Sequence, residues 1–461
     1  MTVNTAHPEY SASVKRWELI RDILGNCAKK HIRLPSDDDA RNAQYREDAI
    51  LTNFTKLTQT GLTGLVFRKP PTVGLPEGIS YLEDDTTGTG VNIWQFAQYI
   101  VSETLALGRI GLLVDYSNGA RKAFIKPYTA ESIINWKTRE VNGVVKPWLI
   151  TLCEWVVKED PLDVFCQDTV KQYRVLRLNA DNIYYQELYN EAEELISQIE
   201  ITDINGNQFD YIPFVFIGSS NNDWVVDSEP LYDMATVNLG HYQCSADQIE
   251  SVFICGQPYL HLDIGETDED TFRLNNPNGV EFGSRKMLIT KGGVATLIQA
   301  SANTMVSGVM QELLAQAAAI GARLISPAGG RETAEAARIR FGSQNSALYT
   351  LTSNVSWAIE DAMKIACIFM GADSEIAEFE LNDEFYEDTA DANLANSMLM
   401  WFDRGIIAEN DLRDYGRRTG VINPDRTNEE LDNEATYLDP LAGAGNAGRN
   451  TTPPTTPDTT G

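Results

Sequence analysis

The sequence contains no long apolar run, few histidines and no closely spaced cysteines. No stretch of about 18 uncharged apolar residues is present, and a membrane-spanning helix requires one of roughly that length. The four histidines and six cysteines are dispersed without a Cys-x-x-Cys pair, whereas structural zinc brings its ligands in close pairs. These absences exclude a membrane span and argue against a zinc or disulfide framework. The start of the chain has no apolar segment behind a basic one, so we expect no secretory signal and an intracellular protein.

Basic side chains are scarce. The chain has 461 residues, with 37 Lys and Arg against 66 Asp and Glu, and its formal net charge is −29. This balance disfavours a protein that wraps nucleic acid with a broad basic surface. The 43% of hydrophobic and 22% of charged residues are typical of a folded globular chain. The length allows one large domain or a few ordinary ones.

Signatures of common enzymes are missing. The sequence has no Gly-x-x-x-x-Gly-Lys-Ser/Thr loop, no Gly-x-Ser-x-Gly elbow, no His-Glu-x-x-His and no EF-hand loop. Gly443, Gly445 and Gly448 have dinucleotide-binding spacing, but they lie near the end of the chain with no expected strand before them or helix after them. We therefore expect no enzymatic activity, no cofactor and no bound metal, which favours a structural or assembly role.

An acidic stretch at residues 371–391 keeps one enzymatic alternative open. Its carboxylates could gather a divalent cation, which takes oxygen ligands; they are Glu378, Glu380, Asp383, Glu384, Glu387 and Asp388. A solvated acidic face is the interpretation we favour, and nothing in the sequence pairs a nucleophile with a base. We interpret His241 and His261 as structural residues.

The first part of the chain reads as helices and the next as strands. Apolar residues at three- and four-residue steps predict helices over residues 8–30, 40–66 and 91–107. Short β-branched and aromatic runs separated by turn residues then predict a mostly antiparallel sheet over residues 110–217. The strongest hairpin signal is Asn142-Gly143.

Two long helical patterns flank a small insertion. Apolar stripes predict helices over residues 231–254 and 302–324, the first about 36 Å long at 1.5 Å per residue. Between them, residues 257–300 read as short strands and turns.

The remainder is expected to be helical up to a low-complexity end. A Pro-Gly-Gly break at residues 326–330 precedes a long helical pattern that Gly371 stops. Shorter helices follow near residues 389–404 and 408–419, and the sequence beyond about 440 is expected to be disordered.

One local feature opposes the acidic balance. Four arginines surround the Pro-Gly-Gly break, with only Glu332 and Glu335 against them; they are Arg323, Arg331, Arg338 and Arg340. Arginines on a loop could touch a phosphate backbone without reading its sequence. The alternative is that they pair with acidic neighbours of the same protein.

The order of these elements and several collinear stretches resemble the portal proteins of tailed bacteriophages. The stretches are HPEYSASVKRWELIRDILGN, NFTKLTQTGLTGLVFRKPP, SETLALGRIGLLVDY, EPLYDMATVNLGHYQCSADQIE, RETAEAARIRFGSQNSALYTLTSNVSWAIEDAMKIACIFMG and FELNDEF. Together they cover most of residues 8–420. No single motif is as specific as a zinc ligand set, so the resemblance depends on their common order.

This resemblance implies an α+β, portal-like fold with regions that the family calls wing, stem, clip and crown. Carried over, the wing corresponds to residues 1–230, the stem helices to 231–256 and 301–324, the clip to 257–300, the tunnel loop to 325–334, the long helix and a wing strand to 335–390, the crown to 391–435, and a disordered tail to 436–461.

The resemblance also implies a function and a set of partners. Portal proteins form a ring, typically a dodecamer, at one capsid vertex of the virion, through which double-stranded DNA is packaged and ejected. The implied partners are the large terminase, head-tail adaptor and tail proteins, and major capsid and scaffolding proteins, with assembly in the host cytoplasm and no membrane. Arg331, Arg323, Arg338 and Arg340 would then contact DNA around the tunnel loop.

Two other classes stay open at this point. One is a metal-dependent hydrolase that uses the carboxylates of residues 373–391, and the other is a structural adaptor of small oligomeric state. Oligomeric state separates these alternatives from a portal, because only the portal assembles as a large ring.

Overall fold

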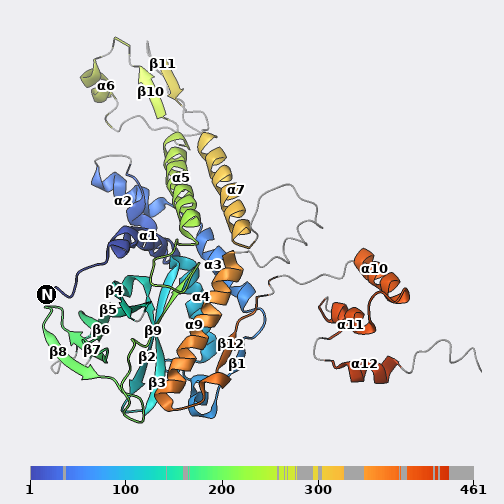
Figure 1. Cartoon of the computed structure of the whole chain (residues 1–461). Helices are drawn as coiled ribbons and strands as arrows, with labels where there is room; N and C mark the ends of the chain where they lie inside the picture. The colour runs from blue at the N-terminus through green and yellow to red at the C-terminus, as the bar shows by residue number, and fades with distance from the viewer. Residues whose placement is uncertain are drawn as a thin grey trace, which may run out of the picture. The chain divides into compact units, whose positions relative to one another are not determined.

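The computed structural model divides into two compact units, residues 1–383 and residues 384–461. The structure describes residues 2–34, 38–141, 143–158, 165, 167–256, 259–263, 265–266, 268–275, 277, 294–298, 304–325, 347–383, 385, 392–418, 421–423 and 426–435. Helices and antiparallel strands both contribute, which confirms the mixed fold class (Figure 1).

The N-terminal region is helical. Its helices are α1 (Pro8–Leu24), α2 (Asp39–Asp48), α3 (Phe54–Val66) and α4 (Ile93–Leu107), with 3-10 turns at Ala28–His31 and Glu77–Leu82. The expectation of one helix over residues 40–66 is wrong, because the chain leaves the helical conformation after Asp48 and Asn53 starts a new helix. The Asn53 Oδ1 atom accepts a hydrogen bond of 2.9 Å from the Lys56 amide and caps α3.

A glycine separates α4 from the first long strand. Gly108 has a φ of +70°, and a Cβ at this position would lie 2.5 Å from the Ser228 carbonyl oxygen. Only glycine fits this turn. A residue with a side chain would be strained in the left-handed backbone conformation, and its Cβ would clash with the neighbouring loop.

The strand-rich region forms two antiparallel sheets, where the sequence analysis expected one. The three-stranded sheet has the order β3-β2-β9, with β2 (Arg109–Ser117), β3 (Lys122–Thr129) and β9 (Phe214–Gly218). In the five-stranded sheet the strands follow one another in chain order: β4 (Ile133–Val141), β5 (Val144–Val157), β6 (Thr169–Leu178), β7 (Tyr184–Tyr189) and β8 (Leu195–Glu200). Val141 pairs with Val144 across the β4–β5 connection, where Gly143 has a φ of +78°. The hairpin predicted at Asn142-Gly143 is confirmed.

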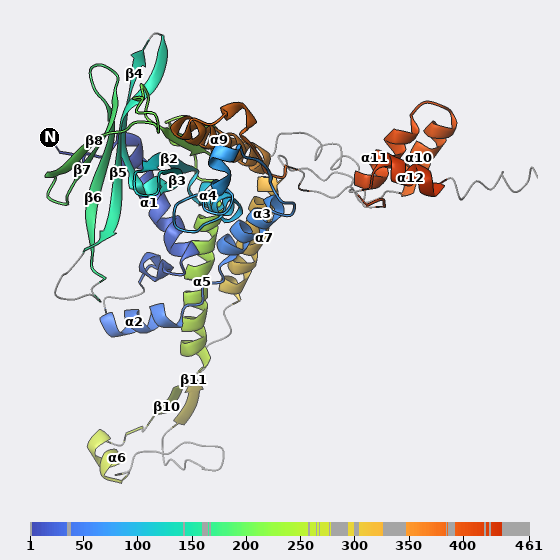
Figure 2. The same cartoon turned by 90° about the horizontal axis from the view of Figure 1, so that it is seen from below.

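One part of the core of the first unit lies between the three-stranded sheet and two helices. Helix α9 (Ala347–Met370) packs against β2, β3 and β9, and α4 packs beside it (Figure 2). Val355, Ile359 and Met363 of α9 are fully buried. β1 (Thr72–Gly74) pairs antiparallel with β12 (Glu378–Glu380), so the strand expected in FELNDEF is present only at its first two residues, Phe379 and Glu380. Gly371, with a φ of +64°, ends α9 as expected.

Helices α5 (Tyr232–Gly256) and α7 (Met305–Ile325) lie side by side and run in opposite directions, close to the two predicted ranges (Figures 1 and 2). The insertion between them contains the antiparallel pair β10 (Tyr259–Asp263) and β11 (Val294–Ile298). It also contains α6 (Glu269–Asn275), a helix that the sequence analysis did not expect. The Thr271 amide donates to the Asp268 carboxylate over 3.3 Å, which supports the first turn of this short helix.

The second unit contains α10 (Ala392–Asp403), α11 (Glu409–Arg418) and α12 (Asn428–Ala435). The first two match predicted helices, whereas α12 was not expected. Arg413 of α11 forms an ion pair of 2.5 Å with Asp432 of α12. The stretch predicted to be disordered, from about residue 440, lies outside the described residues.

Candidate functional site

The arginines selected from the sequence lie at the edge of what the structure describes. Arg331, Arg338 and Arg340 are outside the described residues, as is the Pro-Gly-Gly break. Arg323 belongs to the last turn of α7, where the backbone alone is described. Their contact with DNA therefore stays a prediction.

Helix α7 presents an exposed surface that is almost free of charge. Between Met305 and Gly321 only Glu312 carries a charge, although the helix is widely exposed. Met305 is 76% exposed, Val309 41% and Leu314 44%. An exposed helix with a single charged side chain is unusual, because a face that meets water is normally polar. The scarcity of charge was visible in the sequence, but the exposed face was not.

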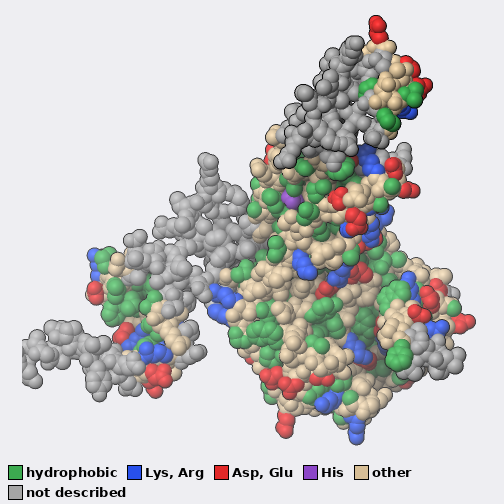
Figure 3. Space-filling model, turned by 180° about the vertical axis from the view of Figure 1, so that it is seen from behind, with side chains coloured by type: hydrophobic (Ala, Val, Ile, Leu, Met, Phe, Trp, Pro, Cys, Tyr) green, Lys and Arg blue, Asp and Glu red, His purple; other side chains and the backbone are tan. Residues whose placement is uncertain are grey.

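The same apolar character continues at the far end of α5. Val252 and Phe253 are each 64% exposed. In the space-filling view, apolar and neutral atoms dominate the side of the helix pair that carries α7, whereas charged side chains gather on the side of α2 (Figure 3). The helix pair thus has one polar flank and one apolar flank.

Helix α5 is attached to the body by a buried amide. The Asn238 side chain is fully buried. Its Oδ1 accepts from the Thr55 amide at 3.2 Å and from the Thr55 hydroxyl at 2.9 Å, and its Nδ2 donates to the Thr52 carbonyl at 2.9 Å. These bonds fix α5 to the start of α3, because each polar group is satisfied away from water.

One turn further along α5, a buried imidazole packs on an aromatic ring. His241 is 4% exposed and meets Phe54 edge to face, with ring centroids 5.7 Å apart. Burial lowers the pKa of His241, so the neutral ring is favoured. This agrees with the interpretation of His241 as structural, whereas the side chain of His261 lies outside the described part of β10.

The second half of α5 is held by polar contacts with α2. Tyr45 donates to the Asp247 carboxylate at 2.5 Å and accepts from Gln243 at 2.8 Å. Arg41 forms an ion pair of 2.6 Å with Glu250. These contacts lie on the polar flank of the helix pair. No described part of the chain covers the apolar flank, which carries α7.

The acidic stretch does not gather into a cluster in its described part. Glu378 and Glu380 are exposed on either side of the buried Phe379 in β12, and Glu384, Glu387 and Asp388 lie outside the described residues. Within the described ranges, no group of three or more His, Cys, Asp or Glu side chains could hold a metal ion. In the same part of the chain no helix is long and apolar enough to cross a membrane.

Comparison with protein families and curated proteins gives one partial match. Residues 230–370 match the model of a family described as a domain of unknown function, DUF4055. The matched range begins just before α5 and ends with α9. No curated protein matches the sequence.

Among solved structures, the chain is similar to proteins from particle necks. One is the neck of an empty GTA particle computed with C6 symmetry, with 12% identity, a TM-score of 0.43, and coverage of 82% of this chain and 92% of that chain. The neck of the native particle computed with C12 symmetry gives 12% identity, a TM-score of 0.43, and coverage of 83% and 93%.

A third similar structure is an HK97 family phage portal protein from Corynebacterium diphtheriae. The identity is 10% and the TM-score 0.32, over 73% of this chain and 96% of that chain. The chain is thus similar to neck proteins of GTA particles and to a phage portal protein.

Proposed function

We propose that this chain is a phage portal protein, twelve copies of which form a ring at one capsid vertex. The observation that carries the proposal is the exposed, almost uncharged face of α7, beside α5 and next to an insertion that interrupts the two helices. A face of this kind needs a cover, and the same face on every copy is covered when copies pack side by side around an axis. The collinear sequence resemblance over residues 8–420 supports the same assignment.

The ring would enclose a channel for double-stranded DNA during packaging and ejection. A chain with a net charge of −29 disfavours tight static binding of a polyanion, and a few arginines provide weak contacts that do not depend on sequence. We assign that contact to Arg331, Arg323, Arg338 and Arg340. Among these, Arg331 stands directly after the Pro-Gly-Gly break and is the first to test.

The insertion that holds β10, α6 and β11 would dock the large terminase and later the head-tail adaptor. Both strands continue from neighbouring ends of α5 and α7, beyond the helix pair (Figure 1). A surface in that place is free to bind a partner while the rest of the chain binds the ring, the capsid and the scaffolding proteins. Replacing residues 265–290 with a short Gly-Ser linker should keep the oligomer and abolish terminase capture in a pull-down.

Native mass spectrometry of the purified chain tests the central proposal. We expect a closed ring with twelve copies as its main species. A monomer, dimer or trimer at micromolar concentration would contradict the portal assignment. The structural adaptor and the metal-dependent hydrolase would then be favoured.

The role of Arg331 has its own test. Arg331→Glu should leave the ring intact and lower DNA packaging or retention, more strongly at low salt because salt screens the charge. Wild-type packaging across low and moderate salt would show that this arginine pairs with acidic neighbours.

A further inference from the structure

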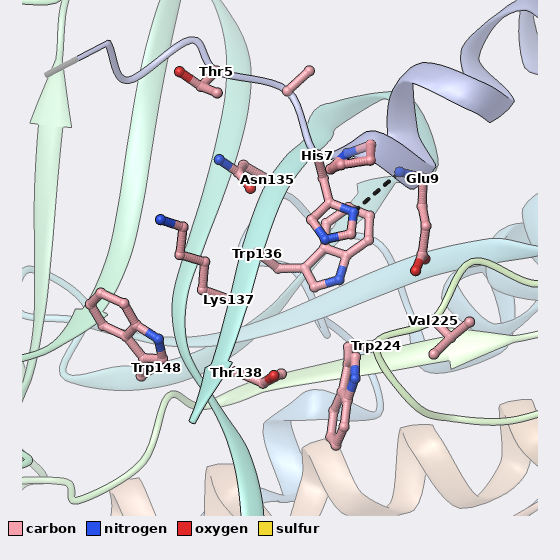
Figure 4. Close-up of a pocket in the computed structure, with 12 residues that line it drawn as sticks. Thr5, His7, Glu9, Asn135, Trp136, Lys137, Thr138, Trp148, Trp224 and Val225 are labelled. Atoms are coloured by element: carbon pink, nitrogen blue, oxygen red, sulfur yellow. Dashed lines mark hydrogen bonds between the residues drawn. The ribbon is translucent and has the colours of Figure 1, made fainter. Parts of the chain in front are cut away.

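A groove lined by three tryptophans lies between the N-terminal segment and the five-stranded sheet. Its volume is about 630 Å³, and Trp136, Trp148 and Trp224 line it together with Thr5, His7 and Lys137. In Figure 4 the His7 ring lies on the Trp136 indole, and Thr138 lies between Trp148 and Trp224. We call this the tryptophan groove.

The floor of the groove is rigidly held. His7 stacks on Trp136 with ring centroids 3.9 Å apart and an interplanar angle of 24°. The Arg109 guanidinium lies 4.0 Å from the same indole centroid, and because His7 covers one face, Arg109 occupies the other. Arg109 also donates to the Trp224 carbonyl at 3.2 Å. The Trp136 indole and the Trp224 backbone are therefore held before any ligand arrives, which lowers the entropy cost of binding.

Arg109 is a buried cation with spare hydrogen-bond donors. It is 2% exposed, and its Nε and Nη2 atoms have no hydrogen-bond partner among the described residues. Burial lowers its pKa to about 10, although Glu9, Asp223 and Asp227 act in the opposite direction. An unpaired buried charge is costly, and this one places positive potential directly behind the groove. Two charged side chains line the groove: the exposed Lys137, and Glu9, whose carboxylate accepts from the Val226 amide at 3.0 Å.

A groove of this chemistry suits an extended peptide that carries proline and a carboxylate. Proline-containing segments in the polyproline II conformation dock on grooves lined by aromatic rings, because their fixed backbone loses little entropy on binding. Indole rings supply the flat apolar surface, and a carboxylate at the end of the segment complements Lys137 and Arg109.

The chain itself carries such a segment. Pro453-Pro454 and Pro457 are followed by Asp458, within the otherwise nearly uncharged sequence Thr451–Gly461. The residues between Ala435 and Thr452 can span about 50 Å when extended. We propose that the tryptophan groove of one copy binds Thr452–Asp458 of a neighbouring copy, with the prolines on the indoles and Asp458 beside Lys137. The choice of a neighbouring copy depends on the proposed ring, whereas the binding of the segment does not.

A synthetic peptide tests the groove directly. A fluorescein-labelled peptide of residues 449–461 is titrated against the full chain, in which Pro453, Pro454 and Pro457 are replaced by alanine so that its own segment does not compete. We expect saturable anisotropy, and a labelled peptide with the same three alanines should not bind.

Two receptor variants locate the binding. Trp224→Ala removes an indole but keeps the carbonyl that Arg109 uses, and it should weaken binding roughly tenfold or more, as loss of an aromatic anchor does. Trp155→Ala is the matched control, because Trp155 is 63% exposed on the same strand as Trp148 and does not line the groove. Lys137→Glu should weaken the wild-type peptide several-fold and have little effect on a peptide that carries Asp458→Asn.

Each outcome is decisive. Absence of saturable binding, equal binding of the peptide without prolines, or equal loss with Trp224→Ala and Trp155→Ala overturns the proposal. Peptide binding is measured whatever the oligomeric state of the chain, and native mass spectrometry is measured without peptide, so a failed ring and a failed groove are read separately. If the peptide binds and native mass spectrometry finds no ring, the groove stands and its assignment to a neighbouring copy falls.

Discussion

Leu313 of α7 lies directly over Gly240 of α5. A Cβ on Gly240 would stand 3.7 Å from both methyl carbons of Leu313, which is ordinary van der Waals contact. The two helices thus meet closely at this point, and Leu313 is half-buried while Leu314 points to the exposed face. Of these neighbouring leucines of α7, Leu313 therefore packs within the chain, whereas Leu314 lies on its surface.

Two substitutions of Gly240 should have opposite effects on stability. Gly240→Ala has room for its methyl group and removes the helix penalty of glycine, so it should stabilise the chain by up to about 1 kcal/mol. Gly240→Leu has no room beside Leu313 and should destabilise by about 1–3 kcal/mol through overpacking. Urea denaturation followed by circular dichroism measures both. Equal stability of the two variants would show that α5 and α7 do not pack at this point.

A charge network around Arg21 should be strongly coupled. Arg21 donates from Nη1 to Glu103 at 2.8 Å and from Nε to Glu131 at 2.6 Å. Burial alone would lower the pKa of Arg21, but the hydrogen bonds to both carboxylates outweigh it and raise the pKa.

Arg21→Met leaves the Glu103 carboxylate, which is 7% exposed, without its partner and should cost about 3–5 kcal/mol of unfolding free energy. The double variant Arg21→Met, Glu103→Leu should recover most of that loss. A double-mutant cycle by urea denaturation measures the coupling between Arg21 and Glu103. If the effects of the two single substitutions are additive, the two residues are not coupled and the prediction is wrong.

Much of the fold could be predicted because local signals decided it. The apolar period of α5 and α7 and the Asn142-Gly143 turn each specify one local geometry, and the structure has those elements. Helix α12 was missed although Thr427 and Glu430 form a reciprocal capping box, in which each side chain accepts from the other's amide at 3.3 and 3.1 Å. An apolar stripe is the usual sign of a helix in a sequence, and this short polar helix has none.

The tryptophan groove could not be predicted from the sequence. His7, Trp136, Trp148 and Trp224 come from four separate segments, which only the tertiary fold brings together. The burial of Arg109 could not be predicted either, because the first residue of a strand gives no sign that its guanidinium will be buried between Trp136 and Phe216.

The attachment of α5 to the body should weaken in acid. Burial lowers the pKa of His241 below its ordinary value of 6.5, so the folded chain binds this proton less readily than the unfolded chain does. The stabilisation is complete above about pH 6.5 and falls as the pH drops through the range between the two pKa values.

Thermal unfolding between about pH 7.5 and pH 5.5 measures the effect. His241→Gln should reduce the loss of Tm on acidification. Burial lowers the pKa of His7 as well, so His7→Gln measures how much of the loss this second histidine contributes. An unchanged slope in His241→Gln would show that the imidazole does not titrate in this range.

The two neighbouring leucines of α7 give the sharpest test of the proposed ring. Leu314→Asp places a carboxylate on the exposed face, where it meets water in the single chain but would be buried without a partner between copies. We expect it to abolish the ring in size-exclusion chromatography with light scattering while the unfolding free energy of the single chain changes by less than about 0.5 kcal/mol. Leu313→Asp should instead destabilise the chain itself, because its carboxylate would lie against α5. Leu195→Asp, the same change at a leucine 52% exposed in β8, is the control and should leave the ring intact. A full ring in Leu314→Asp would show that this face of α7 stays in contact with solvent, and the proposed assembly surface would then be wrong.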